Sequence, residues 1–227
     1  MSFLLADSRQ WRPQMAENLE LRTGKRFHRL TSPEELTAEN VCALQIERAF
    51  FPHWSHRIPE TIFTKIDCVI FHMTDLPFGR GGSPLQNLIV RSIRQTKICA
   101  LRCVAELDAG PVYLRRPLSL DGSAQEIYVA ASAIIEDMIV EIVQRRPQPV
   151  PQTGTPTVFK RRQPADGDIA ALCELKKVYD FIRMLDADGY PRAFLETDGL
   201  RLEFSRARLS GEQVMAEVTI TRKSHGK

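Results

Sequence analysis

The apolar positions of the first part of the chain fall into short runs that are separated by turn signals. Such runs predict strands buried in a sheet, over Phe3–Ala6, Lys25–Leu30, Ile46–Phe51 and Asp67–His72. Helical patterns stand between them, over Arg12–Leu21, after Ser32 and over Glu60–Lys65. Strands and helices in alternation are typical of a parallel sheet with crossover helices. The pattern therefore predicts a Rossmann-like α/β domain, although the chain has no GxGxxG fingerprint.

Beyond this region the pattern predicts a further helix, two strands and one long amphipathic helix. The first helix covers Pro84–Arg94, and the strands cover Lys97–Ala105 and Pro111–Arg116. Ser123 and Glu126 have the spacing of a capping box, so we expect the long helix to begin there. Its apolar stripe is typical of a core-facing helix.

The composition changes after the proline-rich stretch 145–152, which predicts an extended linker. A helical pattern then covers Ile169–Leu185. Three strands follow with glycine-containing turns between them, over Ala193–Glu196, Leu200–Phe204 and Val214–Thr221. We expect one domain over residues 1–146, a linker over 147–165 and a small α+β C-terminal appendage over 166–227.

Composition and charge place the chain among ordinary globular proteins. It has 227 residues, of which 43% are hydrophobic, enough to bury a core. The 31 basic and 28 acidic residues give a net charge of +3, which makes no case for strong nonspecific binding to nucleic acid. Function must therefore be sought in local motifs.

Cysteine usage and the N-terminus both indicate a reducing compartment. The five cysteines contain no CxxC pair and are odd in number, so neither a zinc site nor a disulfide framework is predicted. The apolar run at the N-terminus is too short for a signal peptide, and no segment has the length of a membrane span. We expect a cytoplasmic protein that does not contact a membrane.

His72 ends a predicted buried strand and is followed by a loop rich in proline and glycine. In open α/β sheets ligands bind at the carboxyl ends of the strands, which makes His72 a candidate for chemistry. A histidine at a strand end is also often only a hydrogen-bonded structural residue. Position alone leaves both interpretations open.

Two linked motifs favour a catalytic role for His72 over a structural one. The pattern His72-x-x-x-Leu76-Pro77-x-x-Arg80-Gly81-x-x-Pro84, followed by Leu107-Asp108-Ala109-Gly110-Pro111, resembles the formyltransferases that use 10-formyltetrahydrofolate. The resemblance implies that His72 is catalytic, since it would stabilise an oxyanion and move a proton, and that Asp108 orients it. Without it, Asp108 would be read as a turn residue that bonds its own backbone.

The same resemblance assigns further residues to the folate and acceptor sites. The folate pocket would be lined by Trp54, His56, Arg57, Ile58, Gly82, Val104, Ala105, Glu106 and Leu107. The acceptor side would include Thr74, Arg80 and Asn87. Core packing of Trp54 and a purely structural Arg80 are alternatives. No metal is expected, because His53 and His56 lack further ligands at a suitable spacing.

One position departs from the family pattern. The family has an asparagine two residues before the histidine, where this chain has Ile70. Isoleucine cannot donate a hydrogen bond to an oxyanion. We expect Thr74, Asn87 or a backbone N–H of the glycine loop to replace it, or a greater dependence on His72, because one lost donor costs about 100- to 1,000-fold in rate.

The acceptor is inferred from the short tail and the balanced charge. Both favour the amine of a nucleotide-linked amino sugar over tRNA, and the motif resembles short homologues of pseudaminic-type acid pathways. The alternatives are methionyl-tRNA or another small amine such as glycinamide ribonucleotide, a formyl hydrolase, and a non-catalytic folate-binding homologue. The basic run Lys160–Arg162 could contact a diphosphate or form a solvated surface. A homodimer stays open.

Overall fold

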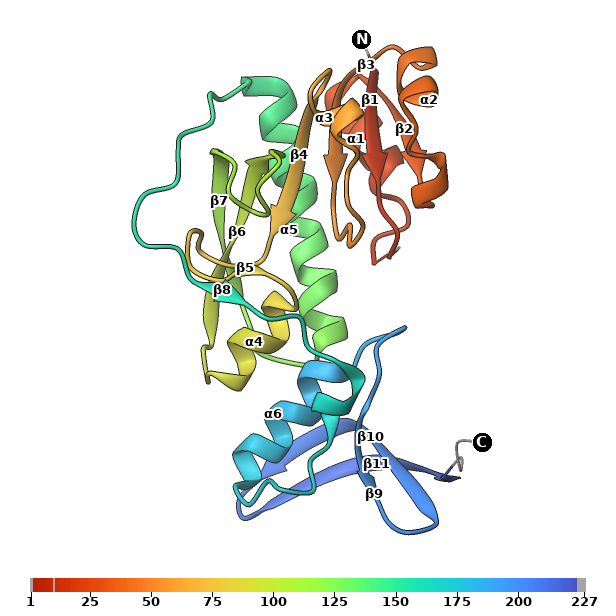
Figure 1. The fold of residues 1–227 in the computed structure, drawn as a ribbon, viewed down its shortest axis with the longest axis vertical. Helices are drawn as coiled ribbons and strands as arrows, with labels where there is room; N and C mark the ends of the chain where they lie inside the picture. Colours follow the sequence, from red (N-terminus) through yellow and green to blue (C-terminus); the bar gives the residue numbers. More distant parts are fainter. Residues whose placement is uncertain (1, 10, 224–227) are drawn as a thin grey trace. The chain divides into compact units, whose positions relative to one another are not determined.

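The computed structural model describes residues 2–9 and 11–223 (Figure 1). The chain divides into two compact units. The first comprises the residues up to Gly81 together with 96–118 and 128–158, and the second comprises 82–95, 119–127 and the chain from Phe159 onward. The boundaries expected from composition, at residues 146 and 165, stay a prediction.

A six-stranded mixed sheet carries the first unit, with the strand order β2-β1-β3-β4-β6-β7. The strands are β1 (Ser2–Ala6), β2 (Arg26–Leu30), β3 (Ile46–Phe51), β4 (Asp67–His72), β6 (Gln95–Arg102) and β7 (Val112–Ser119). β1 pairs in parallel with β2 and β3, and β3 pairs in parallel with β4, which confirms the predicted parallel arrangement for these four strands. β6 runs antiparallel to β4 and places Cys99 opposite His72.

Helices cover both faces of this sheet because alternate side chains of each strand point in opposite directions. Leu4 and Phe51 face one core cluster, which includes Val41 of α2 (Ala38–Ala43) and Ile62 of α3 (Glu60–Phe63). The ring of Phe3 lies 5.2 Å from Phe27 and 5.9 Å from Phe50 on the other side. Burial of these large apolar side chains is the main source of the unit's stability.

Two helices of the first unit are joined through one buried carboxylate. Glu136 of α5 (Ala124–Arg145) accepts hydrogen bonds from Arg12, Asn18 and Arg22, the last two on α1 (Met15–Thr23). Only 3% of the Glu136 side chain is exposed. Burial alone would raise the pKa of Glu136, but the hydrogen bonds from Arg12, Asn18 and Arg22 outweigh it and lower the pKa.

The second unit has a three-stranded antiparallel sheet in the order β11-β10-β9. Its strands are β9 (Ala193–Glu196), β10 (Leu200–Ser210) and β11 (Gln213–Arg222), and they pack against α6 (Leu175–Leu185), as Figure 1 shows in blue. α4 (Pro84–Val90) belongs to the same unit and also packs against α6, with Gln86 Nε2 donating to Met184 O at 3.1 Å.

Several predicted boundaries are wrong, each for a local reason. β6 ends at Arg102 rather than Ala105, because the ladder to β4 closes with the bond from Cys103 N to Cys68 O, and the N–H groups of residues 104–107 find no acceptor among the described residues. α6 begins at Leu175 rather than Ile169, whose N–H instead donates to Phe194 O. α1 begins at Met15 rather than Arg12. The capping box of Ser123 and Glu126 at the start of α5 is confirmed.

Two segments form elements that the pattern did not separate. Residues after Ser32 form a 3₁₀ helix (Pro33–Glu35) and then α2. The proline-rich segment is attached to the first unit rather than free, since Val150 pairs with Val112 across an isolated bridge. Further along, Arg80 N in β5 (Arg80–Gly81) donates to Thr157 O, next to β8 (Val158–Phe159). A second 3₁₀ helix covers Pro164–Gly167 in the second unit.

Candidate functional site

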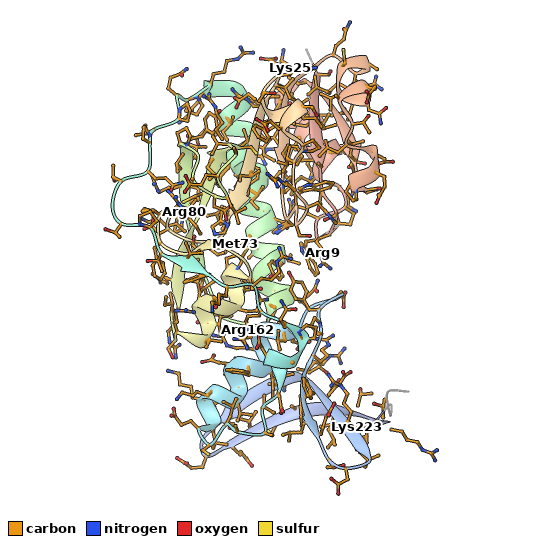
Figure 2. The ribbon with its side chains drawn as sticks, viewed as in Figure 1. Arg9, Lys25, Met73, Arg80, Arg162 and Lys223 are labelled. Carbon is orange, nitrogen blue, oxygen red and sulfur yellow. The ribbon has the colours of Figure 1, made fainter. Side chains whose placement is uncertain are left out.

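His72 is the last residue of β4, and the next residue, Met73, is labelled in Figure 2. Its imidazole is 7% exposed. Nε2 lies 2.7 Å from the carbonyl oxygen of Gly79, and because a carbonyl only accepts, Nε2 carries the proton. Nδ1 lies 3.5 Å from Oδ2 of Asp108. The two residues that the motifs nominate as a catalytic pair therefore lie together, while their roles stay a prediction.

Asp108 is held in a demanding backbone conformation. Its φ is +53°, in the left-handed region. This conformation costs a non-glycine residue free energy, and it persists only where the surroundings impose it. Oδ2 also accepts from Gly81 N at 2.9 Å, so the carboxylate lies between the imidazole and the glycine loop. Two residues on, a Cβ at Gly110 would lie 1.8 Å from Arg102 O, which restricts that position to glycine.

The glycine loop supplies polar backbone groups beside His72. The carbonyl of Gly79 accepts from the hydroxyl of the buried Thr74 at 3.3 Å as well as from His72. The N–H groups of Arg80 and Gly81 are bonded to Thr157 O and Asp108 Oδ2. Within the described residues, no acceptor faces the N–H of Gly79.

Ile70 cannot take part in this chemistry. Its side chain packs against the two core clusters on either side of β4. The groups that could replace the asparagine side chain of the family are therefore Thr74 and the backbone N–H groups of the glycine loop.

Arg80, labelled in Figure 2, braces the loops around the pair. Its Nη1 forms an ion pair with Glu106 Oε1 at 2.9 Å, and its Nε and Nη2 donate to Gln152 Oε1 at 3.2 and 2.9 Å. Only 13% of its side chain is exposed. The structural alternative for Arg80 thus has direct support. Gln152 was not singled out from the sequence, because a glutamine in a proline-rich segment carries no periodic signal.

The residues expected to hold the pterin ring divide into a packed group and an exposed one. The Trp54 ring contacts Phe51 and His56 at 5.9 and 5.3 Å between centroids, and Ile58 is buried in the adjoining core cluster. The indole N–H of Trp54 is buried, and no acceptor for it lies among the described residues. His56 and Arg57 are exposed. Trp54 therefore packs on the core while it offers one unused donor.

The loop Val104–Leu107 presents open backbone to solvent. Among the residues that the structure describes, none accepts from the four N–H groups of this loop. Leu107 is 68% exposed, and Glu106 is held by Arg80. A planar heterocycle with its own donors and acceptors could pair with such a segment, so the residues present fit a pterin.

Cys103 precedes this loop and is half-buried. Burial and the nearby Asp108 charge raise the pKa of its thiol to about 11. The thiol is therefore protonated at neutral pH and is not a nucleophile.

His53 lies near the end of β3, and its Nε2 is bonded within the protein. Its Nε2 lies 2.8 Å from Oγ of Ser132, whose own proton goes to Tyr128 O, so Nε2 donates. Burial, with a smaller contribution from Arg9, lowers the pKa of His53 to about 4. No cluster of three metal-ligating side chains occurs within residues 2–9 and 11–223.

Gly82 and Asn87 belong to the second unit. A Cβ at Gly82 would lie 2.5 Å from Cβ of Arg161, so the loop and the basic run pass very close to each other. Asn87 Nδ2 donates to the carbonyls of Gly82, Ser83 and Lys160. The amide protons of Asn87 are thus already used, and its proposed contact with substrate would require these bonds to break.

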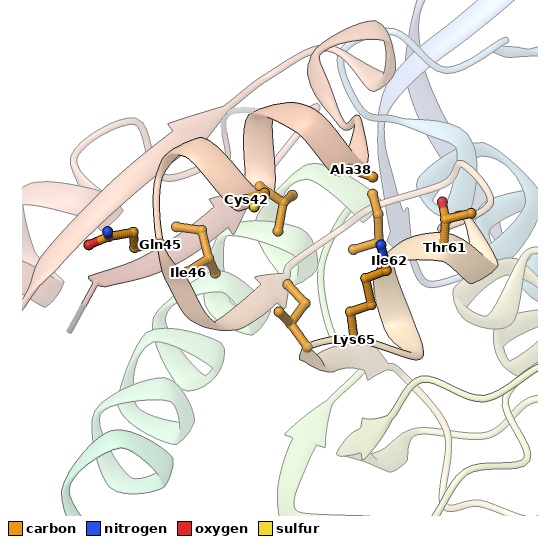
Figure 3. Close-up of a pocket in the computed structure, with 9 residues that line it drawn as sticks. Ala38, Cys42, Gln45, Ile46, Thr61, Ile62 and Lys65 are labelled. Carbon is orange, nitrogen blue, oxygen red and sulfur yellow. The ribbon is translucent and has the colours of Figure 1, made fainter.

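A cavity of about 280 Å³ lies elsewhere in the first unit, between α2 and α3 (Figure 3). Ile46, Ile62 and Ile66 form its apolar wall, and Lys65 stands at its rim. Ile46 begins β3, and Ile66 directly precedes β4. The cavity therefore lies at the amino ends of strands whose carboxyl ends carry His53 and His72.

None of the helices in the described part of the chain combines the length and the apolar character that a membrane span requires.

Comparison with known proteins places the chain among the formyltransferases. Residues 164–221 match the family described as methionyl-tRNA formyltransferase, C-terminal domain. The solved methionyl-tRNA formyltransferase from Clostridium thermocellum is 45% identical, with a TM-score of 0.95 over 98% of this chain and 100% of that chain. On this identity and coverage, the chain belongs to the formyltransferase family.

More distant proteins share the fold. HypX from Aquifex aeolicus, solved in complex with tetrahydrofolic acid, is 18% identical with a TM-score of 0.74, over 91% of this chain and 38% of that one. A sugar N-formyltransferase from Shewanella is 14% identical with a TM-score of 0.69, over 93% and 99%. The expected likeness to sugar enzymes is thus weaker than the likeness to the Clostridium protein. Three curated methionyl-tRNA formyltransferases are 24% to 27% identical over 65% to 85% of this chain, which spans 49% to 63% of their length.

Proposed function

We propose that this protein transfers a formyl group from 10-formyltetrahydrofolate to the α-amine of methionyl-tRNA. The observation that carries the proposal is the 45% identity, over almost the whole chain, to a protein named methionyl-tRNA formyltransferase. The match of residues 164–221 to the C-terminal domain of that family supports the same acceptor. Tetrahydrofolic acid bound to a protein of the same fold supports the donor.

The donor would supply the formyl group as an activated amide, and the chain would supply orientation and charge. The open backbone of Val104–Leu107 would hold the pterin ring. As the amine adds, the formyl oxygen gains negative charge, which the protonated Nε2 of His72 can stabilise in place of its bond to Gly79 O. The new C–N bond forms on the acceptor, the old one breaks at the folate, and the amine proton passes to the leaving nitrogen.

Asp108 would keep His72 competent for this work. Its carboxylate lies 3.5 Å from Nδ1 and would hold the imidazole in the orientation in which Nε2 can reach the formyl oxygen. Thr74 and the free N–H of Gly79 would supplement His72 as oxyanion donors, because Ile70 supplies none. Thr74 and the N–H of Gly79, both on the loop that follows His72, would then take the place of the family's asparagine.

A nucleotide-linked amino sugar is the second candidate acceptor. It is favoured by the near balance of charge, which contrasts with the basic surface that tRNA binding commonly needs. The weaker likeness to the sugar enzyme argues against it. Either acceptor would present a primary amine to the same His72.

The test is transfer of a labelled formyl group by the purified full chain, first to charged initiator methionyl-tRNA and then to nucleotide-linked 4-amino sugars. We expect formyl-methionyl-tRNA, with His72→Ala and Asp108→Asn each slowing turnover by at least about 100-fold. His28→Ala and Asp121→Asn are matched controls outside the site. Formylation of the sugar alone would replace the acceptor, and undiminished turnover by His72→Ala would refute the mechanism.

A further inference from the structure

The segment after α5 crosses the catalytic loops and is attached on both sides of Gln152. Val150 exchanges backbone hydrogen bonds with Val112 at 2.8 and 2.9 Å. Thr157 N donates to Pro77 O at 3.1 Å, and Thr157 O accepts from Arg80 N at 2.9 Å. Gln152 is therefore held over the site between two fixed points, within the first unit.

The Gln152 side chain uses all of its hydrogen-bonding capacity there. Nε2 donates to the carbonyls of Asp108 and Gly110 at 2.7 and 2.9 Å, and Oε1 accepts twice from Arg80. The reversed amide would set its oxygen against two carbonyl oxygens and its NH₂ against a guanidinium. Only one orientation satisfies these partners, so the amide links the Asp108 loop to Arg80 in a defined geometry.

This link bears on the position of the Asp108 carboxylate. Asp108 sits at a φ of +53°, and bonds to its neighbours must hold it there. The bond to its own carbonyl comes from Gln152, while the bond to its carboxylate comes from Gly81, the residue after Arg80. Gln152 thus fixes both the loop that carries the carboxylate and Arg80, the residue before Gly81, whose N–H donates to that carboxylate.

We propose that Gln152 is a positioning residue that holds Asp108 against His72; this rests on the proposed function of that pair. Gln152 does not touch the reacting atoms. It acts by keeping Oδ2 between Nδ1 of His72 and N of Gly81. A shift of about 1 Å in such a group can cost about 100-fold in rate.

The variants separate the two arms of the amide. Gln152→Glu keeps an acceptor for Arg80 but loses both donors to the Asp108 loop, whereas Gln152→Ala loses everything. Gln148→Ala is the matched control, because Gln148 is an exposed glutamine of the same segment. We expect Gln152→Glu to lower kcat about 10- to 100-fold with the KM for the formyl donor within about threefold, and Gln148→Ala to change neither.

Two readouts distinguish positioning from general support of the fold. In an Asp108→Asn background, Gln152→Glu should cost less than about twofold further, because the group it positions is gone. Amide hydrogen exchange at Gly81 should accelerate at least about tenfold in Gln152→Glu and stay unchanged in Gln148→Ala. Additive losses, or Gly81 exchange as slow as in the parent protein, would overturn the proposal. If the parent protein transfers no formyl group, the proposed function fails, and the exchange at Gly81 still decides whether Gln152 holds Asp108.

Discussion

At the scale of single residues, His53 shows how burial sets a protonation state. The neutral imidazole donates to Ser132 Oγ, and the Ser132 hydroxyl in turn donates a hydrogen bond to Tyr128 O. The T-shaped contact with the Tyr128 ring, 5.8 Å between centroids, closes another side. A protonated His53 would bury a positive charge, and among the described residues no carboxylate lies beside the ring to compensate it.

The pH dependence of stability should report this. With a pKa of about 4 folded and about 6.5 unfolded, the unfolded chain binds more protons between these values, so stability falls as pH drops through that window. We expect about 2 kcal/mol of unfolding free energy to be lost between pH 7 and pH 5 on account of His53. Urea unfolding of the parent and of His53→Gln at both pH values measures it. Equal losses in the two proteins would contradict the assignment.

The residues also mark how far sequence reasoning reaches. His72 and Asp108 could be nominated because the two motifs that contain them resemble those of the formyltransferases, whereas position alone left both residues open to a structural interpretation. Gln152 and Glu136 could not, because their partners lie 44 and 124 residues away, respectively, and no short pattern encodes such a contact. Asn87 was nominated for its polarity, whereas its amide braces three backbone carbonyls.

At the scale of elements, the predicted starts of α3, α4 and α5 are confirmed, whereas those of α1 and α6 are wrong. β3 and β4 have the predicted bounds because buried apolar runs must coincide with the sheet. α6 starts late because Asp168 forms a bridge with Phe194 of β9 and the N–H of Ile169 donates to Phe194 O, a tertiary contact that local propensity does not contain. The attachment of residues 150–157 to the first unit was missed for the same reason.

The junction of α1 with α5 gives an element-scale prediction. Glu136→Gln would leave Arg12 and Arg22 without their shared carboxylate, and we expect it to lower the free energy of unfolding by about 2 kcal/mol. Asp137→Asn is the control, since Asp137 bonds the same Arg22 but is 68% exposed, and should cost less than about 0.5 kcal/mol. Urea denaturation at neutral pH compares them. Equal costs would mean that burial of Glu136 adds nothing.

At the scale of the whole molecule, the net charge is only +3, so binding of tRNA phosphates would depend on a small number of basic residues. Arg162 is committed to structure, since its guanidinium stacks on Phe181 at 5.3 Å and its backbone N–H donates to Ser83 Oγ. Lys160 and Arg161 are exposed, and neither forms an ion pair with another described residue. They are the members of the basic run that remain available to phosphates.

The salt dependence of turnover should reveal them. With charged tRNA, Lys160→Gln together with Arg161→Gln should reduce the slope of log(kcat/KM) against log salt by about 2, because each phosphate contact contributes about 0.9. Glutamine keeps the Cβ of Arg161 that packs at Gly82. Lys176→Gln is the control. An unchanged slope would mean that tRNA binds another surface, or that the acceptor is the amino sugar and not tRNA.

The distance along the chain between Asp108 and Gln152 also has a consequence for biosynthesis. During translation, His72 and Asp108 leave the ribosome well before the segment that ties their loops together. Until residues 150–157 emerge, the loop with its unfavourable φ at Asp108 lacks the amide that holds it. A nascent chain, or a fragment that stops before residue 150, would contain both His72 and Asp108. Its Asp108 loop would not yet be held against His72.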